Sequence, residues 1–218
     1  MHGLVRLSGL PADAISMAEA TMEFRRVQPD LFGPPPLAGL AIVEDIVTAE
    51  EERRLTVAID AAELSPFRYQ GWEGRRLTAT FGWRYDFEDG SFRPAEPIPD
   101  WLLPLRENAA RFAGLGPAEL AQALLIRYDP GAGIGWHRDR PVFEHVVGVS
   151  LGAAATMRFR RRRPDDGFDR RSVPLAPRSA YHLSGEARHG WEHSIPEMAA
   201  TRWSVTFRSL SGRGAGRR

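Results

Sequence analysis

The chain has 218 residues, of which 43% are hydrophobic and 26% are charged, a composition typical of a globular protein with a sizeable core in one domain. The formal net charge is only +1, so any contact with nucleic acid would depend on local groups of cationic side chains, all of them arginine. The chain has no cysteine, which excludes disulfide partners, zinc–cysteine sites and iron–sulfur clusters. With no apolar run of about eighteen residues and no signal-peptide pattern, we expect a cytoplasmic protein without a membrane partner.

The first part of the chain predicts an extension, a strand and a helix. We expect residues 1–36 to form an irregular or partly helical extension, because the prolines at its end cannot lie inside a helix. Residues 40–43 are continuously apolar and predict a short buried strand. Thr48 and Glu51 form a capping-box pattern, which opens a helix that we expect to reach about residue 64. The apolar face of this helix comprises Leu55, Ile59 and Ala62.

An aromatic, alternating segment follows at residues 76–87. The pattern predicts strands on either side of Gly82, which either form an ordinary antiparallel pair or cover a substrate site as a lid. After a proline-rich connector, Asp100 is a candidate N-cap for a helix over residues 101–112, and Gly114 would end that helix.

The remainder of the chain predicts a β-rich domain, because short apolar segments are separated by Gly, Pro and Asp and no helix is indicated among them. The expected strands cover residues 123–128, 145–151, 155–160, 179–184 and 202–208. Such a series is typical of a jelly roll or a related sandwich. Residues 211–218, rich in glycine and arginine, predict a disordered basic tail.

Two histidines and one aspartate form the most informative pattern. Residues two apart in a strand point to the same side, so His137 and Asp139 could bind one metal ion while Arg138 points away. With His193 as the third ligand, the set would be a facial triad of two histidines and one carboxylate. Such a triad holds Fe(II) on one face and leaves the other face open.

Three other histidines lie in this region of the chain. His189 lies four residues before His193 and competes with it for the third position. The surroundings of His145 and His182 favour packing or surface roles, because both lie within apolar strand segments.

Residues 202–208 alternate between polar and apolar side chains, which predicts a half-buried strand. Arg202 and Arg208 share the polar face with two hydroxyl residues, Ser204 and Thr206. Such a face could hold a dicarboxylate, because the planar guanidinium group matches a carboxylate in a bidentate way. The alternative is a solvent-exposed polar face on an edge strand.

Taken together, these segments resemble the AlkB family of Fe(II)/2-oxoglutarate dioxygenases. The matching segments are residues 125–139, 149–152, 178–185, 191–195 and 202–208. The resemblance implies a double-stranded β-helix (a cupin-like jelly roll, mainly β) with flanking N-terminal helices over residues 37–210. Within it, the substrate lid would cover about 68–93 and the catalytic core about 121–210.

The resemblance also implies the cofactors. Fe(II) would be bound by His137, Asp139 and His193, and 2-oxoglutarate and O₂ would take the open positions. The residues expected to hold 2-oxoglutarate are Tyr128, Arg202, Ser204, Thr206 and Arg208. Three positions depart from the family pattern: Ile126 and Ser204 replace asparagines, and Pro141 stands where nucleobase-demethylating members often have an acidic residue.

The resemblance favours an N-alkylated nucleobase in DNA or RNA as the substrate. We expect single strands to be preferred, because an unpaired base is easier to unstack, and we expect a monomer. The residues expected to contact this substrate are Arg76, Phe81, Trp83, Tyr85, Arg140 and Arg160. The arginine run at 158–163 would neutralise phosphates or form a solvated strand end. The alternatives are a related oxygenase acting on a protein or other substrate, and a cupin-like metal-binding protein or hydrolase that is not an oxygenase.

Overall fold

The computed structural model describes residues 25–26, 37–69, 71–86 and 89–212. The expected extension at 1–36 lies outside these ranges except for Arg25 and Arg26, and the expected tail lies outside them beyond Gly212. No helix in these ranges is long and apolar enough to cross a membrane.

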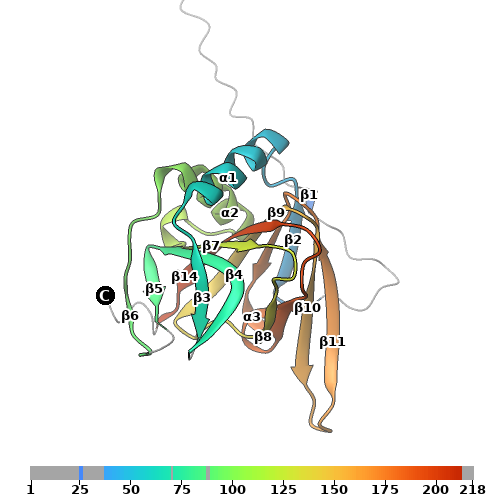
Figure 1. The fold of residues 1–218 in the computed structure, drawn as a ribbon. Helices are drawn as coiled ribbons and strands as arrows, with labels where there is room; N and C mark the ends of the chain where they lie inside the picture. Colours follow the sequence, from blue (N-terminus) through green and yellow to red (C-terminus); the bar gives the residue numbers. More distant parts are fainter. Residues whose placement is uncertain (1–24, 27–36, 70, 87–88, 213–218) are drawn as a thin grey trace, which may run out of the picture.

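Two antiparallel sheets face each other (Figure 1). Within the described residues the larger sheet has eight strands. In spatial order these are β1 (Arg25–Arg26), β2 (Leu40–Glu44), β12 (Ala180–Leu183), β9 (Phe143–Gly152), β14 (Arg202–Leu210), β7 (Gln122–Tyr128), β4 (Trp72–Phe81) and β3 (Ser65–Tyr69). Strands distant in the chain are therefore neighbours in space, as in a jelly roll.

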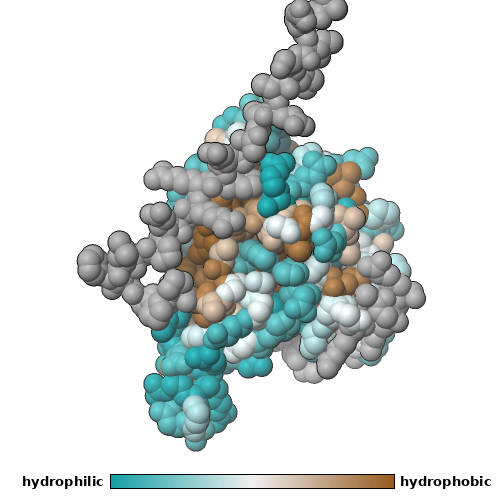
Figure 2. Space-filling model, turned by 180° about the vertical axis from the view of Figure 1, so that it is seen from behind, coloured by the Kyte–Doolittle hydropathy of each residue, from teal (hydrophilic) through white to brown (hydrophobic). Residues whose placement is uncertain are grey.

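The smaller sheet has four strands in the described part of the chain. In spatial order they are β11 (Phe168–Leu175), β10 (Ala155–Arg162), β13 (Glu192–Ile195) and β8 (Ile134–His137). A separate hairpin is formed by β5 (Trp83–Tyr85) and β6 (Phe92–Pro94). The β10–β11 hairpin extends beyond the body of the fold in Figure 1, and Figure 2 shows its end as a hydrophilic lobe.

Two helices cover the outer side of the larger sheet (Figure 1). Helix α1 (Ala49–Ala61) begins at the expected capping box, in which the Thr48 side chain accepts from the Glu51 N–H and the Glu51 carboxylate accepts from the Thr48 N–H. Helix α2 (Leu103–Ala113) ends at Gly114, whose φ of 70° is in the left-handed region that glycine tolerates. Leu55 and Ile59 of α1 are buried in a core with α2 and the sheet.

A second apolar core fills the space between the two sheets. It combines Ile126 and Val146 of the larger sheet with Met157 and Phe159 of the smaller sheet. The paired sheets and the covering helices confirm the expected double-stranded β-helix with N-terminal helices.

The structure corrects three expectations about secondary structure. Asp100 does not cap the second helix, since it lies in a 3₁₀ turn, η1 (Asp100–Leu102), that precedes α2. A short helix, α3 (Gly185–His189), interrupts the β-rich region, where no helix was expected. Strand β11 was not predicted, because its charged residues and proline obscure the alternation. A further 3₁₀ turn, η2 (Pro117–Glu119), precedes β7.

Candidate metal centre and co-substrate cleft

A cleft of about 1660 Å³ opens between the two sheets. Its walls come from the inner faces of both sheets, from β3 and β4, and from the segment that follows β8. The expected ligand set and the polar face of β14 line the same cleft.

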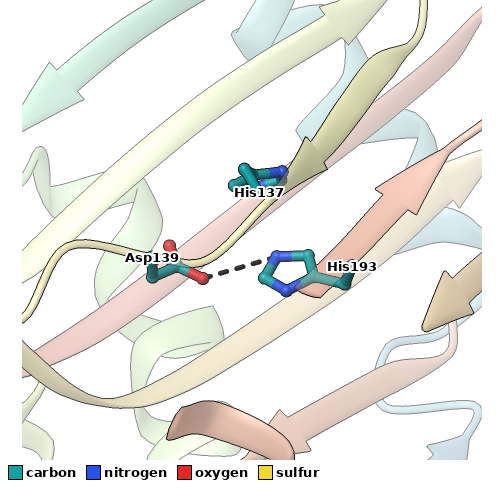
Figure 3. A group of neighbouring side chains, drawn as sticks. All are labelled: His137, Asp139 and His193. Carbon is teal, nitrogen blue, oxygen red and sulfur yellow. Dashed lines mark ion pairs between the residues drawn. The ribbon is translucent and has the colours of Figure 1, made fainter. Parts of the chain in front are cut away.

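The two histidines of the expected triad are cross-strand neighbours. His137 ends β8 and pairs in register with His193 of β13, and their ring centroids are 4.3 Å apart. Asp139 follows β8, and one ligand atom from each of the three residues lies within 4.8 Å of the others (Figure 3). Among the described residues this is the only group of three or more metal-ligand side chains so arranged.

Asp139 is positioned differently from what the sequence predicted. Strand β8 ends at His137, so Asp139 lies in the following loop and not on the same face of one strand. Its carboxylate is instead oriented by β14, because the Nε of Arg208 donates to Oδ1 over 2.8 Å. A second donor from Arg208 reaches Gln122 Oε1 at 3.0 Å, which fixes the guanidinium in turn.

The Asp139 carboxylate has one oxygen available for a further partner. Its side chain is only 5% exposed, and Oδ2 has no hydrogen-bond partner, with the His193 Nε2 lying 3.4 Å away. Burial acts to raise the pKa of Asp139, but Arg208 and the two histidines hold this pKa well below its usual range. A buried, ionised and unsatisfied oxygen is costly unless a cation binds it, so this atom fits a metal ligand.

The histidines are held in the neutral form that binds metal. Burial is the main cause that lowers the pKa of His193 to about 3 and that lowers the pKa of His137. The His137 Nδ1 lies 2.9 Å from the carbonyl oxygen of Gly135, and a hydrogen bond there makes Nδ1 the donor and leaves Nε2 for a metal. Two neutral imidazoles and one carboxylate are the donor set expected for Fe(II).

The competing histidine, His189, also lines the cleft, but it is not part of the group of ligand atoms. His189 is on α3, where it is exposed and its Nε2 is 2.9 Å from a carboxylate oxygen of Glu144. His145 and His182 form their own contact, with Nδ1 of the first 3.0 Å from Nε2 of the second.

The polar face of β14 is buried and not exposed, so the alternative of a solvated edge strand is wrong. β14 lies between β7 and β9 in the larger sheet. Arg202 is 1% exposed, its Nε donates to the Ser150 Oγ over 3.0 Å, and its guanidinium lies 5.1 Å from the centre of the Tyr128 ring. Ser204 and Thr206 are also buried and line the cleft.

No carboxylate pairs with Arg202 within the described ranges of the chain. An ion of this kind, removed from water, needs a counter-ion to repay its desolvation. The planar guanidinium therefore fits a carboxylate ligand that enters the cleft.

Residues of the predicted lid are divided between the cleft and its surroundings. Arg76 is 7% exposed, its pKa is lowered by burial, and its guanidinium lies 3.8 Å from the centre of the Phe67 ring. Phe81 and Tyr85 also line the cleft, and the guanidinium of Arg140 lies 4.6 Å from the Tyr85 ring centre.

Two of the expected substrate residues do not line the cleft. Trp83 stacks on Phe92 with 4.9 Å between ring centroids. Arg160 lies on β10, where its Nε donates to Glu192 over 2.6 Å. Alternation along a strand predicts which face a side chain lies on. Whether that face lines the cleft depends on the neighbouring strands, which alternation does not reveal.

Several cleft residues were missed by the sequence analysis. Tyr181 of β12 is buried, lines the cleft and has its pKa raised to about 12, chiefly by burial. It fits because Gly148 stands opposite it on β9, where an added Cβ would lie 2.2 Å from the ring. Arg188 of α3 donates to the carbonyl oxygens of Arg140 and Phe143, which supports the loop after Asp139. The positions of Tyr181 and Arg188 in the sequence, relative to the metal ligands, did not indicate that they lie at the cleft.

Residues 41–213 match the 2OG-Fe(II) oxygenase superfamily. The chain belongs to this superfamily and is an AlkB-like 2-oxoglutarate-dependent dioxygenase. Members use Fe(II), 2-oxoglutarate and O₂. This removes the alternative of a cupin-like protein that is not an oxygenase.

Three proteins show what this chain is similar to. It is 31% identical over 172 residues to tRNA (carboxymethyluridine(34)-5-O)-methyltransferase alkbh8 of Xenopus tropicalis, over 76% of this chain and 26% of that protein. It is 28% identical to the alkylated DNA repair protein ALKBH8 homolog of Arabidopsis thaliana, over 73% of this chain and 51% of that protein. This chain therefore spans only part of both relatives. The solved structure of OsALKBH1 has a TM-score of 0.63 at 14% identity, covers 86% of this chain and is itself covered completely.

Proposed function

We propose that this dioxygenase oxidatively removes an alkyl group from a nucleobase in single-stranded DNA or RNA. One observation supports this type of reaction. The same cleft contains a metal-ligand set and a buried arginine, Arg202, that has no carboxylate partner among the described residues. A metal site alone would fit many hydrolases, whereas a dicarboxylate co-substrate accounts for both features.

In this proposal His137, Asp139 and His193 bind Fe(II). When bound, Fe(II), 2-oxoglutarate and O₂ supply the oxidising power that hydroxylates a C–H bond of the substrate. Arg202 pairs with the distal carboxylate of 2-oxoglutarate, and the surrounding hydroxyl groups donate to the same carboxylate. The candidates for this donation are Tyr128, Ser204 and Thr206.

Arg208 has a different role in the proposed mechanism. Its hydrogen bond to Asp139 Oδ1 directs the other oxygen of that carboxylate toward the two histidines. The charge of Arg208 also keeps Asp139 ionised, which a ligand requires. If the hydroxylated carbon is an N-methyl group, the product collapses to formaldehyde and the free amine.

Two kinds of observation support a nucleic acid as substrate. The relatives named above include proteins whose names refer to tRNA and to DNA repair. At the cleft, Arg84 and Arg138 are exposed, and no described carboxylate pairs with them. Aromatic side chains, including Phe81 and Tyr85, line the same cleft and could stack on an unpaired base.

The test is a substrate panel with Fe(II) and 2-oxoglutarate, in which formaldehyde and succinate are both measured. Single-stranded DNA and RNA oligonucleotides with N-methylated bases should release formaldehyde, and the unmethylated oligonucleotides of the same sequence should not. Duplexes should react more slowly than single strands, because the base must first be unstacked.

A protein substrate is the second candidate, and one residue favours it. Pro141 lines the cleft where an acidic contact to a base would be expected, and its carbonyl oxygen accepts from Ser211 at 2.7 Å. Formaldehyde release from methylated peptides, with none from any methylated oligonucleotide, would replace the nucleic-acid proposal by this one.

A further inference from the structure

The outer side of the smaller sheet carries arginine and aromatic side chains in alternation. On β10, Met157 and Phe159 point into the core between the sheets, so Arg158 and Arg160, which alternate with them, point outward. The register places Arg170 of β11 opposite Arg160. Phe168 of β11, two residues from Arg170, belongs to the same side.

The aromatic rings of this side lie against the guanidinium groups. Trp136 of β8 has the Arg158 and Arg160 guanidinium carbons 5.2 and 4.6 Å from its ring centre. The Phe168 ring centre lies 4.8 Å from Arg160 and 5.4 Å from Arg170. We call these five residues the outer arginine–aromatic face. They span the four strands of the smaller sheet, a width of roughly 14 Å at the usual strand spacing.

Two arginines of this face, Arg158 and Arg170, differ from the rest of the arginine run in having no carboxylate partner among the described residues. Arg161 pairs with Glu186 and Asp169, and Arg162 and Arg163 pair with aspartates of the hairpin turn. On the outer face, Arg160 pairs with Glu192. Arg158 and Arg170 have no carboxylate partner among the described residues, and Arg158 donates only to the Ser194 Oγ at 3.1 Å.

The face is continuous with the cleft. Trp136 lines the cleft while it lies beneath Arg158 and Arg160. Its near neighbour Arg138 is exposed and also lines the cleft. A polymer that left the cleft past Trp136 would therefore meet cationic groups and aromatic rings in succession.

We propose that the outer arginine–aromatic face binds the part of a single-stranded nucleic acid that flanks the nucleotide in the cleft. This rests on the proposed nucleic-acid substrate and adds where the rest of the strand binds. Unpaired guanidinium groups suit the phosphates, and the rings suit unstacked bases, which is the combination that sequence-tolerant single-strand binding uses.

The proposal predicts that position, and not net charge, determines affinity. Arg158→Ser/Arg170→Ser removes two arginines from the face, and Arg162→Ser/Arg163→Ser removes two ion-paired arginines from the same hairpin. Binding of a fluorescent single-stranded oligonucleotide is measured against salt concentration for both variants, after thermal unfolding has shown that both are folded. Each lost phosphate contact should reduce the slope of log K against log salt by about 0.7. The first variant should therefore lose about 1.4 of slope, and the control should lose much less.

A third variant tests the aromatic part. Phe168→Ala should weaken binding by about fivefold or more, the lower range for one stacked base, while the salt slope stays the same because no charge is removed. Equal slopes in the two arginine variants, or an unchanged affinity in Phe168→Ala, would overturn the proposal.

The same experiments separate this proposal from the proposed function. If the face variants lose binding and no methylated oligonucleotide is demethylated, the surface stands and the proposed reaction fails. If methylated oligonucleotides are demethylated and the face variants bind like the control, the reaction stands and the surface fails.

Discussion

The inner face of β14 and the outer side of the β10–β11 hairpin have similar sequences and opposite environments. In both, arginines share one face of a strand and apolar residues lie on the other face. On β14, Arg202 is fully buried and has no carboxylate partner among the described residues. On the hairpin, Arg162 pairs with Asp166 although both side chains are mostly exposed, at 70% and 83%.

The difference shows that the counter-charge, and not the arginine itself, indicates function. A buried guanidinium without a carboxylate has lost its hydration, which destabilises the fold, and a bound anion offsets this loss. An exposed guanidinium beside an aspartate has kept its hydration and contributes little. The outer arginine–aromatic face lies between these extremes, because it is accessible and only part of its charge is compensated.

The largest effect is expected at the metal end of the inner face. His193→Ala should reduce iron content and 2-oxoglutarate turnover to background, because two protein ligands cannot maintain the facial geometry. The fold should persist, since His193 contributes little to the apolar core between the sheets. Iron content and the unfolding temperature are measured together, and His189→Ala is the control that retains iron. Iron retained in His193→Ala but lost in His189→Ala would reverse the ligand assignment.

Arg202→Lys should raise the KM for 2-oxoglutarate by tenfold or more. A planar fork becomes a single point charge, and the loss of one charge-assisted pair costs roughly 1.5–3 kcal/mol. Steady-state kinetics at saturating substrate measure the change, with Arg162→Lys as the control for an ion-paired surface arginine. An unchanged KM for 2-oxoglutarate, with only the KM of the second substrate altered, would contradict the assignment.

The partly buried histidine pair His145 and His182 shows the effect of lost hydration on a titratable group. Burial, with a smaller effect of His145, lowers the pKa of His182 to about 4. The unfolded chain therefore binds more protons than the folded chain between about pH 6.5 and about pH 4. The free energy of unfolding should fall as the pH falls through this window. Urea unfolding of His182→Gln should show a shallower loss than the wild type, and equal slopes would remove His182 as a cause.

The smallest effect is expected from the exposed hairpin. Arg162→Ser should change the free energy of unfolding by less than about 1 kcal/mol, because exposed ion pairs contribute little. Denaturant titration at low and high salt measures this difference. A loss well above that value, persisting at high salt, would show that the pair is structural and would weaken the contrast with Arg202.

The amino-acid sequence by itself determined the local features of this protein. The capping box of α1, the glycine end of α2 and the two faces of β14 depend on residues close together in the chain, so spacing and side-chain type were sufficient. The pairing of His137 with Asp139 was also visible, although its stated reason was only partly correct, since Asp139 lies beyond the strand.

The tertiary structure alone decided which environment each of these features has. The sheet brings β14 between β7 and β9, and this burial turns the polar face of β14 into the wall of a cleft. The hairpin turn and α3 supply the carboxylates that neutralise Arg161, Arg162 and Arg163. Trp83 and Arg160 fall outside the cleft for the same reason. Burial and counter-charge depend on strands that are distant in the chain, and short-range alternation carries no information about those partners.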